Sequence, residues 1–126
     1  MPDVLICDRD RTQAETWAHP IAASGHTIDF VESSSRAVQR VLAEPCGVVF
    51  VSVSLSDEEG LDTISVVHDL DSQLPVVAVA ERESLDLERE ARLRKVFYYL
   101  VQPVDAEELE AVVGRALAAK PGGGAA

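Results

Sequence analysis

The chain has 126 residues, of which 47% are apolar, and is therefore the size of one domain that can bury a core without disulfides or bound metals. Its formal net charge of −11, from 22 acidic residues against 11 Lys and Arg, argues against binding to nucleic acid or anionic membranes, which needs a basic surface. No apolar run reaches the roughly 18 residues of a membrane span, and the N-terminus carries acids instead of a basic leader, so we predict a cytoplasmic location.

Five short runs of β-branched and aromatic residues alternate with stretches of helical pattern. This alternation predicts an α/β domain with a parallel sheet covered by helices on both faces. Two of the runs are almost continuously apolar, as expected of central strands, whereas the second run alternates and suits an edge strand. The predicted strands are Val4–Cys7, Ile28–Val31, Val48–Val53, Val76–Ala80 and Val96–Val101.

The intervening helices have recognisable start signals. Asp10 and Asp105 each stand three residues before a Gln or Glu, which is the spacing of a capping box, and Ser33 precedes another amphipathic stretch. Pro20 falls inside the first helix and predicts a kink, because proline removes a backbone donor. The segment 84–94 interleaves leucines with charges and predicts only a short or mobile element.

The predicted domain covers residues 1–119, and residues 120–126, with three consecutive glycines, are expected to form a flexible tail or linker. Cys7 lies within the first apolar run and Cys46 in a turn-like Pro-Cys-Gly segment, so both are interpreted as free thiols. The histidines lack the spacing of metal ligands. We therefore expect no metal site and no cofactor.

Ligands of open parallel sheets bind beyond the carboxyl ends of the strands, so the residues that follow each apolar run are the candidate site. These positions offer no nucleophile paired with a base and no phosphate-cradling glycine loop, so we expect no enzyme activity. The positions are Asp8, Arg9, Asp10, Ser52, Ala80, Gln102 and Pro103.

From Val4 to about Ala119 the order and spacing of these segments resemble the receiver domain of two-component response regulators. The resemblance rests on the first strand with its acid Asp8, on segment 47–61 with Gly60 eight residues beyond Ser52, on the Pro-Val-Val that starts the fourth strand, and on Tyr99–Asp105. It implies a flavodoxin-like fold with a doubly wound five-stranded sheet in the order 2-1-3-4-5.

In that family, phosphoryl transfer uses an Asp nucleophile, two acids that hold Mg²⁺, a Thr or Ser, and a Lys. Alignment on Gly60 retains only the first acid, Asp8. The other four positions hold Arg9 for the second acid, Ser52 for the nucleophile, Ala80 for the hydroxyl and Gln102 for the lysine. A serine cannot form an acyl phosphate, and a guanidinium repels a divalent cation. The resemblance thus implies an atypical receiver with a degenerate phosphorylation pocket.

Two interpretations of Arg9 stay open: its charge neutralises Asp8 through a hydrogen bond, in place of a metal, or it points to solvent. Asp10 is better interpreted as a helix cap than as a metal ligand. The acidic run 57–59 is expected to be a solvated loop with a helix cap, and Asp57, five residues past the strand end, is expected to lie outside the pocket.

Tyr99 matches the family's switch aromatic, although an ordinary strand aromatic is the alternative. The Gln102–Pro103 peptide bond is expected to be cis, because X-Pro bonds adopt this form most readily and the family uses one there. Four basic residues around the predicted fourth helix indicate either a docking patch for an acidic partner or second copy, or a solvated helix with local partners. They are Arg89, Arg92, Arg94 and Lys95.

The leading hypothesis is an atypical receiver that acts independently of phosphorylation, as a protein-interaction and regulatory module in bacterial two-component-type signalling. It predicts a protein partner or self-association through the face formed by the fourth helix, fifth strand and fifth helix, and no contact of this domain with nucleic acid or membrane. The alternative is a receiver fold gated by a small-molecule or anion ligand in the altered pocket. Thermal shifts on ligand addition separate the two.

Overall fold

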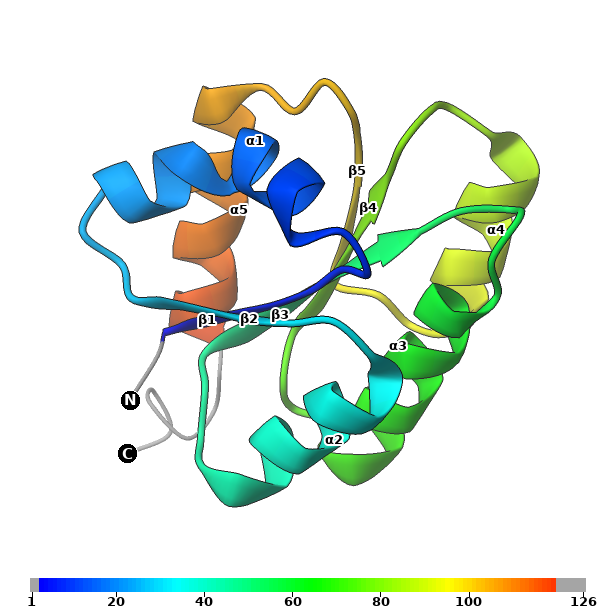
Figure 1. Ribbon diagram of the computed structural model, residues 1–126, viewed down its shortest axis with the longest axis horizontal. Coiled ribbons are helices and arrows are strands. Elements are labelled where there is room, and N and C mark those ends of the chain that lie inside the picture. Colours follow the sequence, from blue (N-terminus) through cyan, green and yellow to red (C-terminus); the bar gives the residue numbers. More distant parts are fainter. Residues whose placement is uncertain (1–2, 120–126) are drawn as a thin grey trace.

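The computed structural model describes residues 3–119 and has five parallel strands in the order β2-β1-β3-β4-β5, with helices on both sides (Figure 1). This is the flavodoxin-like order expected from the sequence. The predicted tail, 120–126, lies outside the described residues. The strands are β1 (Val4–Cys7), β2 (Ile28–Val31), β3 (Val48–Val53), β4 (Val76–Ala80) and β5 (Tyr98–Val101). The helices are α1 (Arg11–Ala23), α2 (Ser34–Ala43), α3 (Glu59–Leu70), α4 (Leu85–Leu93) and α5 (Ala106–Ala119).

One boundary differs from expectation around α4. The segment 84–94 forms a short helix of nine residues, which agrees with the first of the two predicted alternatives; Leu87 and Ala91 are buried, and the Ser84 side chain accepts a hydrogen bond from the Leu87 backbone N–H. Strand β5 begins at Tyr98, two residues later than predicted. Lys95 has a φ of 66°, so the chain turns there before it joins the sheet.

The predicted helix starts are confirmed by their hydrogen bonds. Asp10 accepts from the Gln13 backbone N–H at 3.1 Å, and Ser33 and Asp105 accept from the backbone of the third residue after each of them. Pro20 lies inside α1. Each cap fixes where the chain leaves the sheet edge, which in turn positions the loops that carry the candidate site.

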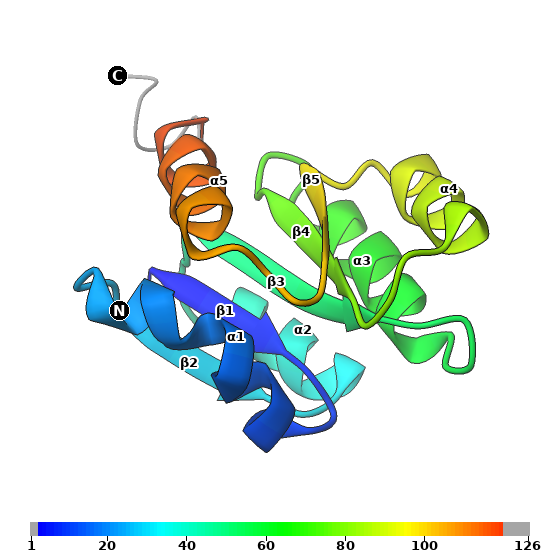
Figure 2. The same ribbon diagram turned by 90° about the horizontal axis from the view of Figure 1, so that it is seen from above.

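Two apolar cores cover the two faces of the sheet. Helices α1 and α5 lie on one face and α2, α3 and α4 on the other (Figures 1 and 2). Alternate residues of β3 serve the two cores: Phe50 packs against Trp17 of α1, with ring centroids 5.6 Å apart, while Val49 and Val51 face the other helices. Within residues 3–119, no helix is long and apolar enough to cross a membrane.

Candidate functional site

Asp8 and Ser52 meet at the carboxyl edge of the sheet, at the ends of the neighbouring strands β1 and β3. The Ser52 hydroxyl donates a hydrogen bond to Asp8 Oδ2 at 2.6 Å, and the Asp10 backbone N–H donates to Asp8 Oδ1 at 2.9 Å. Asp8 is only 8% exposed. Both oxygens of this buried carboxylate are therefore occupied by donors from the protein itself, as a buried charge requires.

Gly60 brings the start of α3 against the end of β3. A Cβ atom at this position would lie 2.2 Å from the Ser52 carbonyl oxygen, so only glycine fits the close approach. This contact gives a physical reason for the glycine eight residues beyond Ser52.

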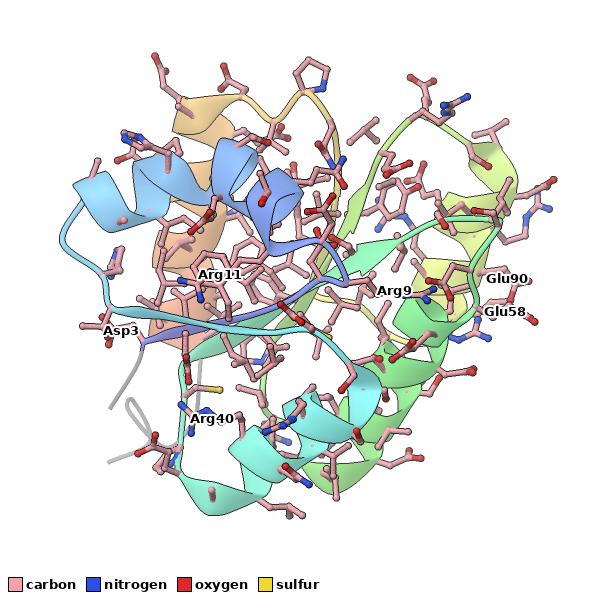
Figure 3. The ribbon with its side chains drawn as sticks, in the orientation of Figure 1. Asp3, Arg9, Arg11, Arg40, Glu58 and Glu90 are labelled. Carbon is pink, nitrogen blue, oxygen red and sulfur yellow. The ribbon has the colours of Figure 1, made fainter. Side chains whose placement is uncertain are left out.

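Arg9 pairs with Asp57 and not with Asp8. Its Nη1 lies 2.5 Å from Asp57 Oδ2, and its side chain, 68% exposed, points from the β1–α1 loop toward the loop that precedes α3 (Figure 3). The hypothesis of an Arg9–Asp8 hydrogen bond is wrong, because the Arg9 guanidinium binds the Asp57 carboxylate instead. The Arg9 guanidinium, together with the Glu59 backbone N–H, holds the pKa of Asp57 below its usual value.

Asp57 lines the cavity at the sheet edge, contrary to the expectation that it lies outside. The reason is the path of the loop: Ser54 and Asp57 form an isolated antiparallel bridge, so the chain after β3 folds back over the edge. The Asp57 Oδ1 atom also accepts from the Glu59 backbone N–H at 3.0 Å. Asp57 thus provides the helix cap expected of this acidic run, and it also forms an ion pair with Arg9.

Glu59 is a further site residue that the sequence did not reveal. Its Oε2 accepts a hydrogen bond from the Ser34 backbone N–H at 2.8 Å, at the first residue of α2. A carboxylate is favourable there because the N-terminus of a helix carries unsatisfied donors and partial positive charge. The available signal was an acid in the first turn of α3, but nothing in the spacing pointed to α2.

The cavity at this edge has a volume of about 200 Å³ and an acidic lining. Among residues 3–119, six carboxylates and one guanidinium line it: Asp8, Asp10, Glu32, Asp57, Glu59, Glu81 and Arg9. Cys7 also lines it, and burial raises the pKa of its thiol to about 12, aided by Glu59 and Asp8. The lining therefore disfavours an anion such as phosphate on simple electrostatic grounds.

Ala80 and Gln102, the other two predicted pocket residues, do not line this cavity. Ala80 is fully buried in β4, beside Val53 of β3. The Gln102 backbone N–H donates to the Ala80 carbonyl at 2.9 Å, and its side-chain Nε2 is buried without a partner among residues 3–119. The Gln102–Pro103 bond is cis, as predicted.

Tyr99 is buried on the α4 side of the sheet and is 8% exposed. Its neighbour across the ladder is Ala78, and Ala80 lies further along the same face, so small side chains leave room for the ring. Its hydroxyl has no partner among the described residues. Burial raises the pKa of Tyr99, with a smaller contribution from Glu88. A switching role for Tyr99 stays a prediction.

The basic residues of α4 are largely neutralised by their own helix. Acids three or four residues earlier pair with them as Asp86–Arg89, Glu88–Arg92 and Glu90–Arg94. This matches the interpretation of a solvated helix with local partners. The exposed apolar side chains of the same face, Leu85 and Leu93, are 74% and 68% exposed.

The model of the response regulator receiver domain family matches residues 4–114. The chain belongs to this family. It is 23% identical over 116 residues to the transcriptional regulatory protein ZraR of Escherichia coli (strain K12), covering 92% of this chain and 26% of ZraR. It is equally 23% identical over 115 residues to the DNA-binding transcriptional regulator NtrC of Bradyrhizobium sp. (strain RP501 Parasponia), covering 91% of this chain and 24% of NtrC.

A solved CheY-like response regulator receiver domain protein from Methanospirillum hungatei JF-1 has the same fold, with a TM-score of 0.82 at 17% identity over 96% of this chain and 97% of that one. The receiver domain of NtrX from Brucella abortus likewise matches with a TM-score of 0.82, at 21% identity over 91% of this chain and 98% of that one. The chain spans about a quarter of the length of the curated relatives that it matches.

The residues at the sheet edge do not fit the Mg²⁺ ion of the receiver family. Both Asp8 oxygens accept hydrogen bonds from the protein, and the Arg9 guanidinium lies at the cavity beside Asp57. Magnesium requires near-octahedral oxygen ligands, whereas the Asp57 carboxylate is already paired with Arg9 and the Glu59 carboxylate with the Ser34 backbone N–H. Within the described part of the chain, no group of three His, Cys, Asp or Glu residues is arranged to hold a metal ion.

Proposed function

We propose that this receiver domain acts as a phosphorylation-independent protein-interaction and regulatory module in bacterial two-component-type signalling, without enzymatic activity and in the cytoplasm. The observation that carries the proposal is the Ser52–Asp8 hydrogen bond. The end of β3, where the family's nucleophile is expected, holds a hydroxyl whose proton is directed at the one acid that matches the family.

The chemistry of the edge supports this proposal. A serine hydroxyl oxygen forms a stable phosphate ester and not the reactive acyl phosphate of an aspartate, and the acidic cavity repels the anionic donor. The lysine position holds Gln102, which brings no charge to neutralise a phosphoryl group. Regulation by such a domain therefore operates through binding, with the receiver fold as scaffold.

The proposal is tested by phosphorylation of the purified 126-residue chain with acetyl phosphate and Mg²⁺, monitored by intact mass, and by amide NMR spectra with beryllofluoride. The matched control is a variant that restores the family residues by Arg9→Asp, Ser52→Asp, Ala80→Thr and Gln102→Lys. We expect no mass increase and no beryllofluoride shifts in the native chain, and both responses in the control. Stoichiometric phosphorylation of the native chain would refute phosphorylation independence.

We further propose that the face formed by α4, β5 and α5 binds the protein partner or a second copy of the chain. Because the α4 arginines are paired with acids of their own helix, the exposed Leu85 and Leu93 are the contact residues that this face offers. Leu93→Asp should abolish self-association, measured by sedimentation equilibrium, or the binding of the protein partner. Leu42→Asp, which changes an equally exposed leucine of α2, should leave it intact.

A receiver fold gated by a ligand is the second candidate, and the cavity of about 200 Å³ favours it. Its six carboxylates direct the search to small cationic compounds instead of anions. Thermal unfolding with and without a panel of polyamines and of phosphate esters tests this candidate, because a ligand that binds the folded state raises Tm. A saturable rise in Tm would favour ligand gating over a purely protein-binding module.

A further inference from the structure

The Arg9–Asp57 ion pair joins two loops across the cavity. Arg9 belongs to the β1–α1 loop and directly follows Asp8, which is itself fixed by Ser52 and by the Asp10 backbone. Asp57 belongs to the β3–α3 loop, and its two oxygens bind Arg9 on one side and the Glu59 backbone N–H on the other. Each end of the pair is therefore next to, or part of, a carboxylate that makes a further hydrogen bond at the edge.

The pair lies in the lining of a cavity whose acids repel one another. Six carboxylates line the cavity, and Arg9 is the one positively charged side chain in that lining among residues 3–119. A bridging cation acts by attracting carboxylates from two loops at once. The Arg9 guanidinium does the same for Asp57, with the difference that the charge belongs to the chain and is always present.

The link continues from Asp57 to a third loop. Glu59, whose backbone N–H donates to Asp57, accepts a hydrogen bond with its carboxylate from the Ser34 backbone N–H at the start of α2. The loops that follow β1, β3 and β2 are thereby connected in series through protein contacts alone. A disturbance of Arg9 should consequently reach Ser34, although the two residues belong to different loops.

We propose that Arg9 is a built-in replacement for the family's divalent cation: its pairing with Asp57 ties the β1–α1 and β3–α3 loops together and fixes the sheet edge in one arrangement at any Mg²⁺ concentration. The inference rests on the proposed function, because a domain that signals without phosphorylation has no chemical step that requires Mg²⁺. It goes further by assigning the structural part of the cation's role to one residue.

The test uses amide NMR spectra and hydrogen exchange of the full chain with Arg9→Gln, Asp57→Asn and the double variant. Each single variant should shift the amides of residues 57–59 and of Ser34 and accelerate exchange of the Glu59 N–H several-fold. The double variant should add nothing to either single change, because the pair acts as a unit.

Arg89→Gln is the matched control, because it removes an exposed arginine whose partner, Asp86, lies in the same helix far from the cavity in sequence. It should leave the amides of residues 57–59 unchanged. If Arg9→Gln does not fold, Arg9→Lys keeps the charge and should preserve the link to Ser34. Unchanged amides at 57–59 in both Arg9→Gln and Asp57→Asn would overturn the proposal.

A titration with MgCl₂ against NaCl of equal ionic strength completes the test. We expect no Mg²⁺-specific shifts in the native chain, and saturable shifts at Asp8 or Asp57 would overturn the proposal. Its failure is distinguishable from that of the proposed function. If the chain takes up a phosphoryl group but shows the Arg9–Asp57 coupling, only the proposed function is refuted. If the chain takes up no phosphoryl group but its amides do not respond to Arg9→Gln, only the proposed role of Arg9 is refuted.

Discussion

Glu59 of α3 caps a different helix: its carboxylate accepts the backbone N–H of Ser34, the first residue of α2, at 2.8 Å. Ser33, the formal cap of α2, accepts from the Arg36 backbone N–H. The start of α2 therefore has two acceptors, one local and one supplied from across the sheet edge. This arrangement couples the position of α2 to the loop that follows β3.

Removal of the Glu59 charge should therefore weaken α2 from a distance. We expect Glu59→Gln to lower the free energy of unfolding by about 0.5–1 kcal/mol, the usual magnitude for a charge at a helix N-terminus. Urea unfolding at pH 7 measures it. Glu58→Gln removes the neighbouring acid, which also lies at the N-terminus of α3 but makes no side-chain capping bond, and should have a smaller effect because it does not contact α2. Equal effects of the two substitutions would contradict the contact.

Gly60→Ala should destabilise the fold by about 1–3 kcal/mol, because the added methyl group would overlap the Ser52 carbonyl oxygen and push α3 away from β3. The same substitution at Gly114, where an added Cβ would meet no atom of residues 3–119 within 4 Å outside the backbone of its own helix, should stabilise α5 by about 0.5–1 kcal/mol. Chemical unfolding of the two variants measures whether the free energy of unfolding falls for Gly60→Ala and rises for Gly114→Ala. Similar effects at both positions would argue against the close contact.

Ser52→Ala should cost about 1–3 kcal/mol of stability at pH 7, because it leaves the buried Asp8 carboxylate with one donor fewer. The comparison is Ser54→Ala, which should be close to neutral, because the Ser54 hydroxyl forms a hydrogen bond with the Ser56 hydroxyl at 3.2 Å and with no other side chain among residues 3–119. Denaturant midpoints of the two variants provide the measurement. A neutral Ser52→Ala variant would show that the hydroxyl does not stabilise Asp8.

Stability should fall as pH rises above 9. The pKa of the Cys7 thiol is raised from 9.0 to about 12 in the folded state, so between these values the folded chain binds more protons than the unfolded chain. Between pH 8 and 10 the native chain should lose about 1 kcal/mol more than the Cys7→Ala variant does. Urea unfolding at the two pH values tests this, and parallel losses in both proteins would contradict it.

Tyr99→Phe should be neutral or should raise stability by up to about 1 kcal/mol, because the buried hydroxyl has no partner among residues 3–119 and its removal relieves a desolvation penalty. Tyr98→Phe should instead lower stability slightly, since its hydroxyl donates to Glu108 at 3.0 Å. Thermal unfolding distinguishes the two. A clear loss of stability in Tyr99→Phe would reveal a partner for that hydroxyl.

The sheet could be predicted from the sequence because burial on both faces makes a strand almost continuously apolar, as in Val48–Val53. Helix starts were equally predictable, since Asp10, Ser33 and Asp105 act on the residues that directly follow them. The adjacency of Asp8 and Ser52 followed from the rule that parallel strands end at one edge. All three inferences use local patterns or a simple rule of topology.

The electrostatic contacts of the edge could not be predicted in the same way. The Arg9–Asp57 pair depends on the fold-back of the chain at Ser54, and the contact of Glu59 with α2 depends on how two loops cross. The conformation of these loops is not encoded by any periodic pattern of residues in the sequence. The pairing of α4 was different, since the spacing of Glu88 and Arg92 by four residues is a signal that the sequence contained.

The two apolar cores include neither Asp8, Arg9, Ser52 nor Gln102. A change at one of these residues alters local hydrogen bonds and charges but removes no atom from the interior that gives the domain most of its stability. The polar residues at the sheet edge can therefore be substituted while the sheet and its covering helices keep their fold. For the same reason, this domain should accept designed binding or catalytic residues at edge positions such as Arg9 and Gln102, provided that the Ser52–Asp8 hydrogen bond is kept.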